Sequence, residues 1–87
     1  MSRIGAGIEQ LADLRATFDR ESAEVDRLTR TVGGRVQSTD WEGPAAERFR
    51  SAWQGDFEPA LRRLQAALQE AAAEVDRRRI ALLEAGG

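Results

Sequence analysis

The sequence predicts an all-α fold, an antiparallel hairpin of two long helices that pairs with a second hairpin into a four-helix bundle dimer. Three observations lead to this expectation. Apolar residues recur every seven positions in each half of the chain. Charged residues fill the positions between them, which is typical of amphipathic helices. Polar turn residues followed by a Gly-Pro pair occupy the middle of the 87-residue sequence.

The first helix is expected over residues 4–37. Its seven-residue series is Ile4, Leu11, Phe18, Val25 and Val32. Gly33-Gly34 is the weak point of this helix, because each Gly costs about 1 kcal/mol in a helix interior. The helix therefore either ends near Val32 or continues to Gln37. We favour the longer helix because Val36 continues the apolar pattern.

A turn is expected over residues 38–43, where Ser, Thr and Asp precede Trp41-Glu42-Gly43. Pro44 then suits the first turn of a helix, where its missing N–H does no harm. The second helix is expected over residues 44–84, since its apolar series ends in Leu61, Leu68, Val75 and Leu82. Pro59 would clash with the carbonyl of Gly55 in a straight helix, so we expect a kink near residues 55–59.

The expected dimer follows from the shape of the hairpin. Two helices side by side cover only part of each other's apolar faces, and an uncovered apolar strip marks an interaction surface. Small domains of this size also gain stability from oligomerisation. The sequence leaves open whether the partner is identical. The residues expected in the core or dimer interface are Leu11, Phe18, Val25, Phe49, Trp53, Phe57, Leu61, Leu64 and Leu68.

Composition argues against several classes of function. The chain is expected to form one domain over residues 1–87, with no Cys, His or Tyr and a formal net charge of −2. It lacks the usual general base and the commonest metal ligand, so we expect no enzyme, no cofactor and no metal site. No apolar run reaches the length of a membrane span, and the amino end has no apolar core typical of a cleaved signal peptide. We therefore expect no membrane insertion.

A cluster of three consecutive arginines, Arg77-Arg78-Arg79, suggests nucleic-acid binding as an alternative. Three consecutive helical residues point in different directions, and Glu74 and Asp76 lie close in sequence. A solvated helix end is the better interpretation, because cations are favourable near a helix C-terminus. We expect no nucleic-acid partner.

The motif with the most functional information is Trp41-Glu42-Gly43 at the centre of the chain. Trp53-Gln54-Gly55 has the same spacing, but it lies inside a helical stretch and is not followed by a helix start. The run from Trp41 to Phe49, WEGPAAERF, resembles the WXG family, the early-secreted-antigen-like proteins of type VII secretion. Length and two amphipathic helices extend this resemblance over essentially the whole chain.

The resemblance implies a hairpin that dimerises with itself or a sister WXG-family protein. It also implies export of the folded protein by an ATPase-driven type VII machine, without a cleaved signal peptide, in actinobacteria and related Gram-positive bacteria. Trp41 and Gly43 would then form part of the export surface. Many family members carry a Tyr followed four residues later by an acidic residue. Here Ile80 and Glu84 have that spacing without the phenol, and would be a degenerate export signal.

A different class of function remains open beside this one. The chain would then be a structural, coiled-coil-like adaptor that stays in the cytoplasm, with the motif serving only as turn chemistry.

Overall fold

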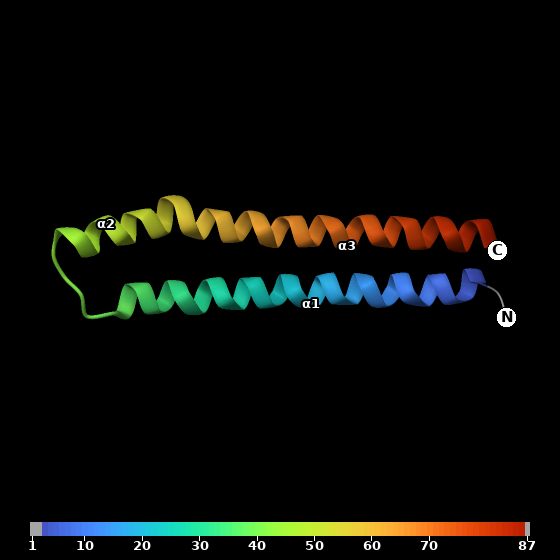
Figure 1. Cartoon of the computed structure of the whole chain (residues 1–87), viewed down its shortest axis with the longest axis horizontal. Helices are drawn as coiled ribbons and strands as arrows, with labels where there is room; N and C mark the ends of the chain where they lie inside the picture. The colour runs from blue at the N-terminus through green and yellow to red at the C-terminus, as the bar shows by residue number, and fades with distance from the viewer. Residues whose placement is uncertain (1–2, 87) are drawn as a thin grey trace.

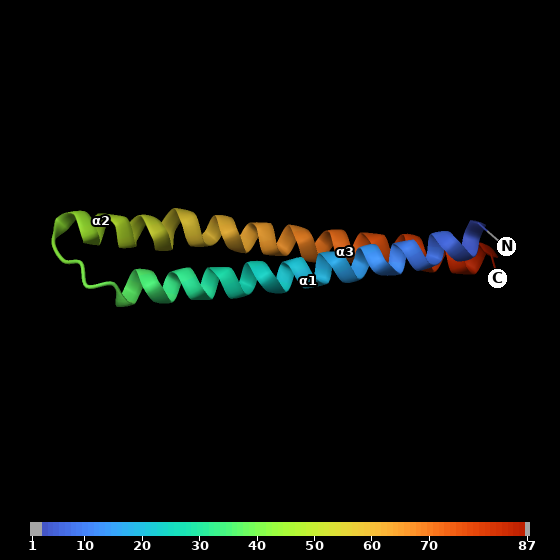
Figure 2. The same ribbon diagram turned by 60° about the horizontal axis from the view of Figure 1, so that its bottom comes forward.

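The computed structural model describes residues 3–86, and it confirms the predicted all-α hairpin. One arm is α1 (Arg3–Ser38). The other arm consists of α2 (Pro44–Ala52), a short π-helix η1 (Trp53–Phe57) and α3 (Glu58–Gly86). The arms run antiparallel, with the turn at one end of the molecule and the termini at the other (Figure 1). The rod measures 65 × 17 × 12 Å along its principal axes, and its arms cross at a small angle (Figure 2).

The first helix is longer than Gly33-Gly34 alone would suggest. It continues through both glycines to Ser38, against the expected range of 4–37. Gly33 faces the other arm, where a β-carbon would lie 3.5 Å from the indole Nε1 of Trp53. The packing of this side chain on α1 offsets the poor helix propensity of Gly33.

The second arm is irregular where Pro59 was expected to cause a kink. The irregularity is a π-helical turn, in which the backbone N–H of Glu58 donates to the carbonyl of Trp53 five residues earlier. Pro59 follows as the second residue of α3. A wide turn leaves room for a ring that would clash with the carbonyl of Gly55 in a regular α-helix. The proline is thus accommodated by one π-turn, and the arm continues to Gly86.

The seam between the arms consists mainly of small residues. Ser22 and Thr29 are buried on α1, as are Ala46 on α2 and Ala72 on α3. Trp53 is the one large apolar side chain buried among residues 7–86, at 7% exposure. Small side chains let two helices approach closely, because the side chains at the contact set the interaxial distance. The buried core is therefore narrow, a single row of mostly small side chains along the contact between the two arms.

Most residues expected in the core or interface flank this seam. Within the single chain Trp53 alone of the nine is buried. Five are half-buried, namely Leu11, Phe18, Val25, Leu61 and Leu68. Phe49, Phe57 and Leu64 are 42–50% exposed, so they do not belong to the core of the hairpin. The two-position seam of an amphipathic pattern is narrower than the apolar face, and here small residues occupy its centre.

Candidate protein-interaction site at the turn

The two faces of the hairpin differ in chemistry. On one face, two ion pairs join the arms: Arg15 with Asp76 at 2.7 Å, and Arg62 with Asp26. Hydrogen bonds from Arg62 and Arg15 hold the pKa values of the Asp26 and Asp76 carboxyls below their ordinary value. These pairs are solvent-accessible, so they contribute little to stability; their main effect is to favour one alignment of α1 along α3.

The opposite face carries large apolar side chains. Leu28 precedes the buried Thr29, and Leu64 precedes the half-buried Gln65. Since the arms are antiparallel, residues one position before a seam residue lie on the same side of both helices. Each exposed member of this face is 42–50% accessible. We call this face the apolar strip, and it consists of Leu14, Leu28, Trp41, Phe49, Phe57 and Leu64.

Aromatic contacts connect the turn to the strip. The ring centroids of Trp41 and Phe49 are 5.9 Å apart, and those of Phe49 and Phe57 are 6.3 Å apart. Both distances lie within the range of favourable aromatic pairs. The indole of Trp41 is therefore the outer end of an aromatic row that reaches into the second arm.

An open apolar cavity of about 270 Å³ lies beside this row, where α1 ends. Its wall includes Val32 and Val36 of α1, together with the rings of Trp41 and Phe49. Arg35 and Thr39 complete the lining. The cavity joins the end of the first arm to the start of the second, and it has the size and polarity to take one apolar side chain of a partner.

Gly43 has a backbone conformation that other residues rarely adopt. Its φ is 107° and its ψ is 176°, and it is the residue before the first turn of α2. No side-chain cap is present at this helix start, but the Gly43 carbonyl accepts the first helical hydrogen bond, from Glu47 N–H at 3.1 Å. No atom lies within 4 Å of a β-carbon built on Gly43, so backbone conformation alone requires glycine here.

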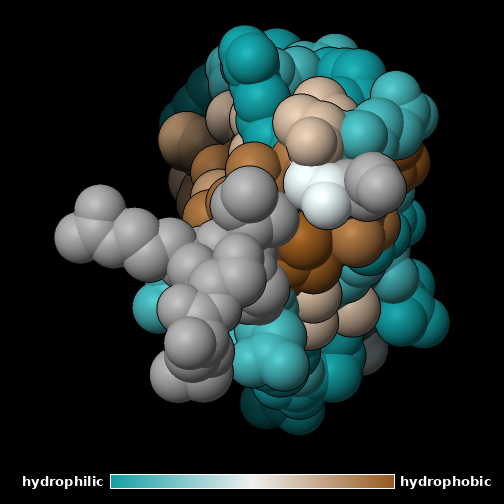
Figure 3. All heavy atoms as spheres, turned by 90° about the vertical axis from the view of Figure 1, so that its right-hand side faces the viewer, coloured by the Kyte–Doolittle hydropathy of each residue, from teal (hydrophilic) through white to brown (hydrophobic). Residues whose placement is uncertain are grey.

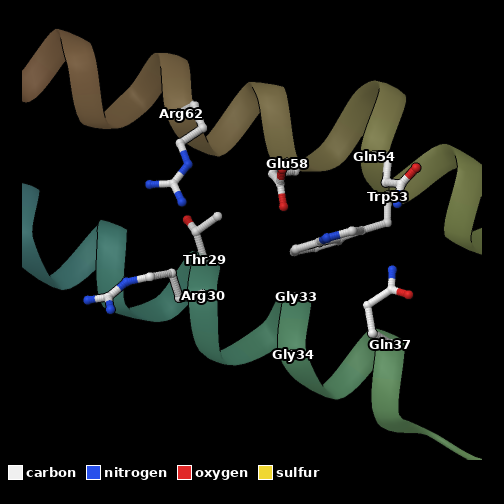
Figure 4. Close-up of a pocket in the computed structure, with 9 residues that line it drawn as sticks. All are labelled: Thr29, Arg30, Gly33, Gly34, Gln37, Trp53, Gln54, Glu58 and Arg62. Carbon is white, nitrogen blue, oxygen red and sulfur yellow. The ribbon is translucent and has the colours of Figure 1, made fainter.

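The second Trp-x-Gly sequence has a different role. Trp53 turns inward from η1 and lies over Gly33 (Figure 4). The side chain is one wall of an open hollow of about 590 Å³, whose lining includes polar groups of both arms such as Gln37, Gln54 and Glu58. Trp53 therefore packs the seam, whereas Trp41 is 44% exposed at the turn.

Ile80 and Glu84 lie on α3, at the end of the rod away from Trp41 (Figure 1). Ile80 is 43% exposed, and Glu84 is also exposed. A view onto the end of the rod that carries the termini shows hydrophobic residues between hydrophilic ones (Figure 3). A single chain does not bring the turn motif and these two residues together.

The arginine cluster near the end of α3 is internally paired. Arg77 and Arg78 contact Glu74 at 2.6 and 2.9 Å, and Arg79 contacts Asp76 at 3.0 Å. Each of these three guanidinium groups therefore contacts a carboxylate, but the carboxylates are shared: Glu74 between Arg77 and Arg78, and Asp76 between Arg79 and Arg15.

The residues that sequence reasoning missed are Arg50 and the small seam residues. Arg50 donates hydrogen bonds to three backbone carbonyls around the turn. A single Arg in a helix gives no sequence signal for such a role, because the bonds span 9 to 14 residues. Ser22 and Thr29 share a seven-residue spacing with each other, but polar residues are rarely assigned to a core.

No helix in residues 3–86 is long and apolar enough to cross a membrane. Within the same residues, no group of acidic side chains is arranged to hold a metal ion.

The fold and this site define a helical hairpin with an exposed aromatic turn. Comparison with known proteins finds no matching family model, no similar curated protein and no similar solved structure.

Proposed function

We propose that this chain is a non-enzymatic protein-binding module that pairs with a second helical hairpin along the apolar strip. The observation that carries the proposal is the strip itself. Its six large apolar side chains are each 42–50% exposed on the hairpin alone. Large apolar side chains exposed along one face of a domain mark an interaction site, and a second hairpin completes a four-helix bundle.

The strip fits a helical partner better than it fits a small molecule. The rod is 65 Å long, and its apolar residues extend from Leu14 to the turn on one arm and from Phe49 to Leu64 on the other. Two facing helices of similar length would cover both rows. The ion pairs Arg15–Asp76 and Arg62–Asp26 lie on the other face, where they would remain in water.

The partner in this proposal is a second copy or a sister hairpin of the WXG family, and the exporting machine is a type VII secretion ATPase. The resemblance supplies this identification. The exposure of Trp41 supports it, since a recognition residue must be accessible. Gly43 supports it as well, because its backbone lets the chain reverse directly after the indole. The protein would be secreted without a cleaved signal peptide.

Pairing with a second hairpin would also explain how the degenerate export signal, Ile80 and Glu84, could act together with Trp41. Ile80 and Glu84 belong to the last turns of α3, whereas Trp41 lies in the turn between α1 and α2 at the other end of the rod. A composite export surface therefore needs the end of a neighbouring chain beside the turn. Many family members have a Tyr where this chain has Ile80. In this proposal the sister protein therefore carries the complete C-terminal export signal, a Tyr followed four residues later by an acidic residue. The chain described here would then travel as one half of a heterodimer.

The test is an export assay in a cell with a type VII machine, with the chain expressed alone and together with a sister hairpin of that machine. Trp41→Ala is expected to keep its helix content and remain in the cell pellet. Trp53→Phe, a matched change of the inward-facing indole, is expected to be exported. Normal export of folded Trp41→Ala protein would refute the recognition role.

A structural adaptor inside the cell is the second candidate, and the φ of 107° at Gly43 favours it, because turn geometry alone accounts for this residue of the motif. It predicts that the paired protein stays in the cell pellet whatever residue occupies position 41. Export of the wild-type chain would exclude it.

A further inference from the structure

Arg50 forms the densest set of hydrogen bonds to the turn. Its Nε donates to the carbonyl of Val36 at 3.1 Å. Its two terminal nitrogens donate to the carbonyls of Trp41 at 2.9 Å and of Thr39 at 2.8 Å. The side chain is half-buried between the end of α1 and the start of the second arm.

One of these three bonds satisfies a carbonyl that the end of α1 leaves unpaired, and the other two hold carbonyls of the turn. The last four carbonyls of a helix have no intrahelical partner, and a cationic side chain can serve them. Val36 supplies one of these carbonyls from α1, whereas Thr39 and Trp41 lie beyond its last residue, Ser38. The planar guanidinium presents donors in a fixed fork, so one side chain holds three carbonyls at once.

The bonds also restrain Trp41 at its backbone. The Trp41 N–H donates to the Thr39 carbonyl at 2.9 Å, and Arg50 binds the carbonyls of both residues. The indole meets the ring of Phe49, which directly precedes Arg50 on α2. One turn of α2 thus holds the main chain and the ring of Trp41 together.

We infer that Arg50 is a positioning residue that fixes the orientation of the Trp41 indole at the hairpin turn, the orientation in which a partner recognises it. The recognition part rests on the proposed function above, and the positioning part rests on the hydrogen bonds alone. Without the guanidinium, the three carbonyls lose their Arg50 donor, and Trp41 keeps its backbone bond to Thr39 and the contact of its ring with Phe49. The indole then samples several orientations although both arms remain helical.

The first experiment follows the two indoles separately by fluorine NMR on protein labelled with 5-fluorotryptophan. Trp41→Phe assigns the two resonances. Arg50→Gln is expected to shift and narrow the Trp41 signal, leave the Trp53 signal in place and preserve the circular-dichroism spectrum. Amide exchange at Trp41 should also speed up, because the Thr39 carbonyl that accepts from the Trp41 N–H is no longer held by Arg50.

Arg48→Gln is the matched control, because Arg48 is on the same helix, is exposed and forms no ion pair within residues 7–86. A Trp41 signal and exchange rate equal to those of Arg48→Gln would overturn the positioning role. If Arg50→Gln loses its helix content, Arg50→Lys decides, since it keeps the charge without the fork. Arg50→Lys should shift and narrow the Trp41 fluorine signal relative to the wild type, and an unchanged Trp41 signal in this variant would overturn the inference.

The second experiment compares export of the folded variants. Arg50→Gln is expected to be retained in the cell like Trp41→Ala, and Arg48→Gln to be exported. Normal export of Trp41→Ala would refute the proposed function, and the NMR result would still decide whether Arg50 positions the indole. Retention of Trp41→Ala with normal export of Arg50→Gln would show that the orientation does not matter, which overturns the recognition part.

Discussion

The indole of Trp53 lies against Gly33, with its Nε1 3.5 Å from the place a β-carbon would occupy on that residue. This contact joins the two arms near the turn. The π-turn that begins at Trp53 and the Gly33-Gly34 pair of α1 therefore meet at one place in the fold.

Trp53→Ala should be the most destabilising single change in the hairpin. The indole is the one large apolar side chain buried among residues 7–86, and truncating a buried Trp costs about 3–5 kcal/mol. Urea unfolding followed by circular dichroism measures the loss. The adjacent Gln54→Ala, at an exposed position, should change the free energy of unfolding by less than about 0.5 kcal/mol. Equal effects of the two changes would contradict the role of Trp53 in the seam.

Two glycine substitutions should have opposite signs. Gly43→Ala should destabilise by about 1–3 kcal/mol, because its φ of 107° is a conformation that L-residues adopt only under strain. Gly34→Ala should stabilise by about 0.5–1 kcal/mol, since the site is helical and open and Ala is the better helix former. Thermal unfolding of both proteins checks the pair. A stabilised Gly43→Ala protein would show that the turn does not need this backbone conformation.

A charge placed on the apolar strip should weaken pairing. Leu64 is 48% exposed on the hairpin alone, and covering a Leu is worth about 1.5–3 kcal/mol. Leu64→Glu should therefore raise the dissociation constant at least about tenfold. The control is Gln69→Glu, which adds the same charge at an exposed position of α3 away from the strip. Analytical ultracentrifugation gives both constants, and equal values would place the interface elsewhere.

Stability should decrease in acid, because Asp26 and Asp76 have lowered pKa values in the folded protein. Each carboxyl starts from an ordinary value of 3.8 and is hydrogen-bonded to an Arg of the opposite arm. A lowered pKa means that the stabilisation is present above the unfolded value and is lost as the pH falls through the folded one. The loss should begin near pH 5 and grow below pH 4.

The double variant Asp26→Asn and Asp76→Asn should show a flatter dependence of unfolding free energy on pH across this range. Asp13→Asn is the control, since Asp13 is exposed on α1 and in no ion pair within residues 7–86. A slope in the double variant as steep as in the wild type would assign the acid sensitivity to other carboxyls.

The arms and the turn could be predicted from the sequence because they follow from local signals. Apolar residues every seven positions predict the helices, and Gly43-Pro44 predicts the second helix start. The π-turn could not be predicted, because Pro59 can be accommodated by a kink or by a wider turn, and no local sequence signal distinguishes the two.

The candidate site was predictable only in part. The position of Trp41 at the turn follows from the motif. The three bonds of Arg50 and the small seam residues Ser22 and Thr29 depend on which residues face each other across the arms. Periodicity gives the width of an apolar face, but it does not say which part of that face a neighbour covers.

The measurement that tests the central claim most directly is sedimentation equilibrium of the wild-type chain, combined with urea unfolding at several protein concentrations. The proposed pairing predicts a mass near twice the 9.6 kDa of one chain, or a shift to that mass when the sister hairpin is added, with an unfolding midpoint that rises with concentration. A fully helical, cooperatively unfolding monomer whose midpoint is independent of concentration, and which binds no second hairpin, would contradict it.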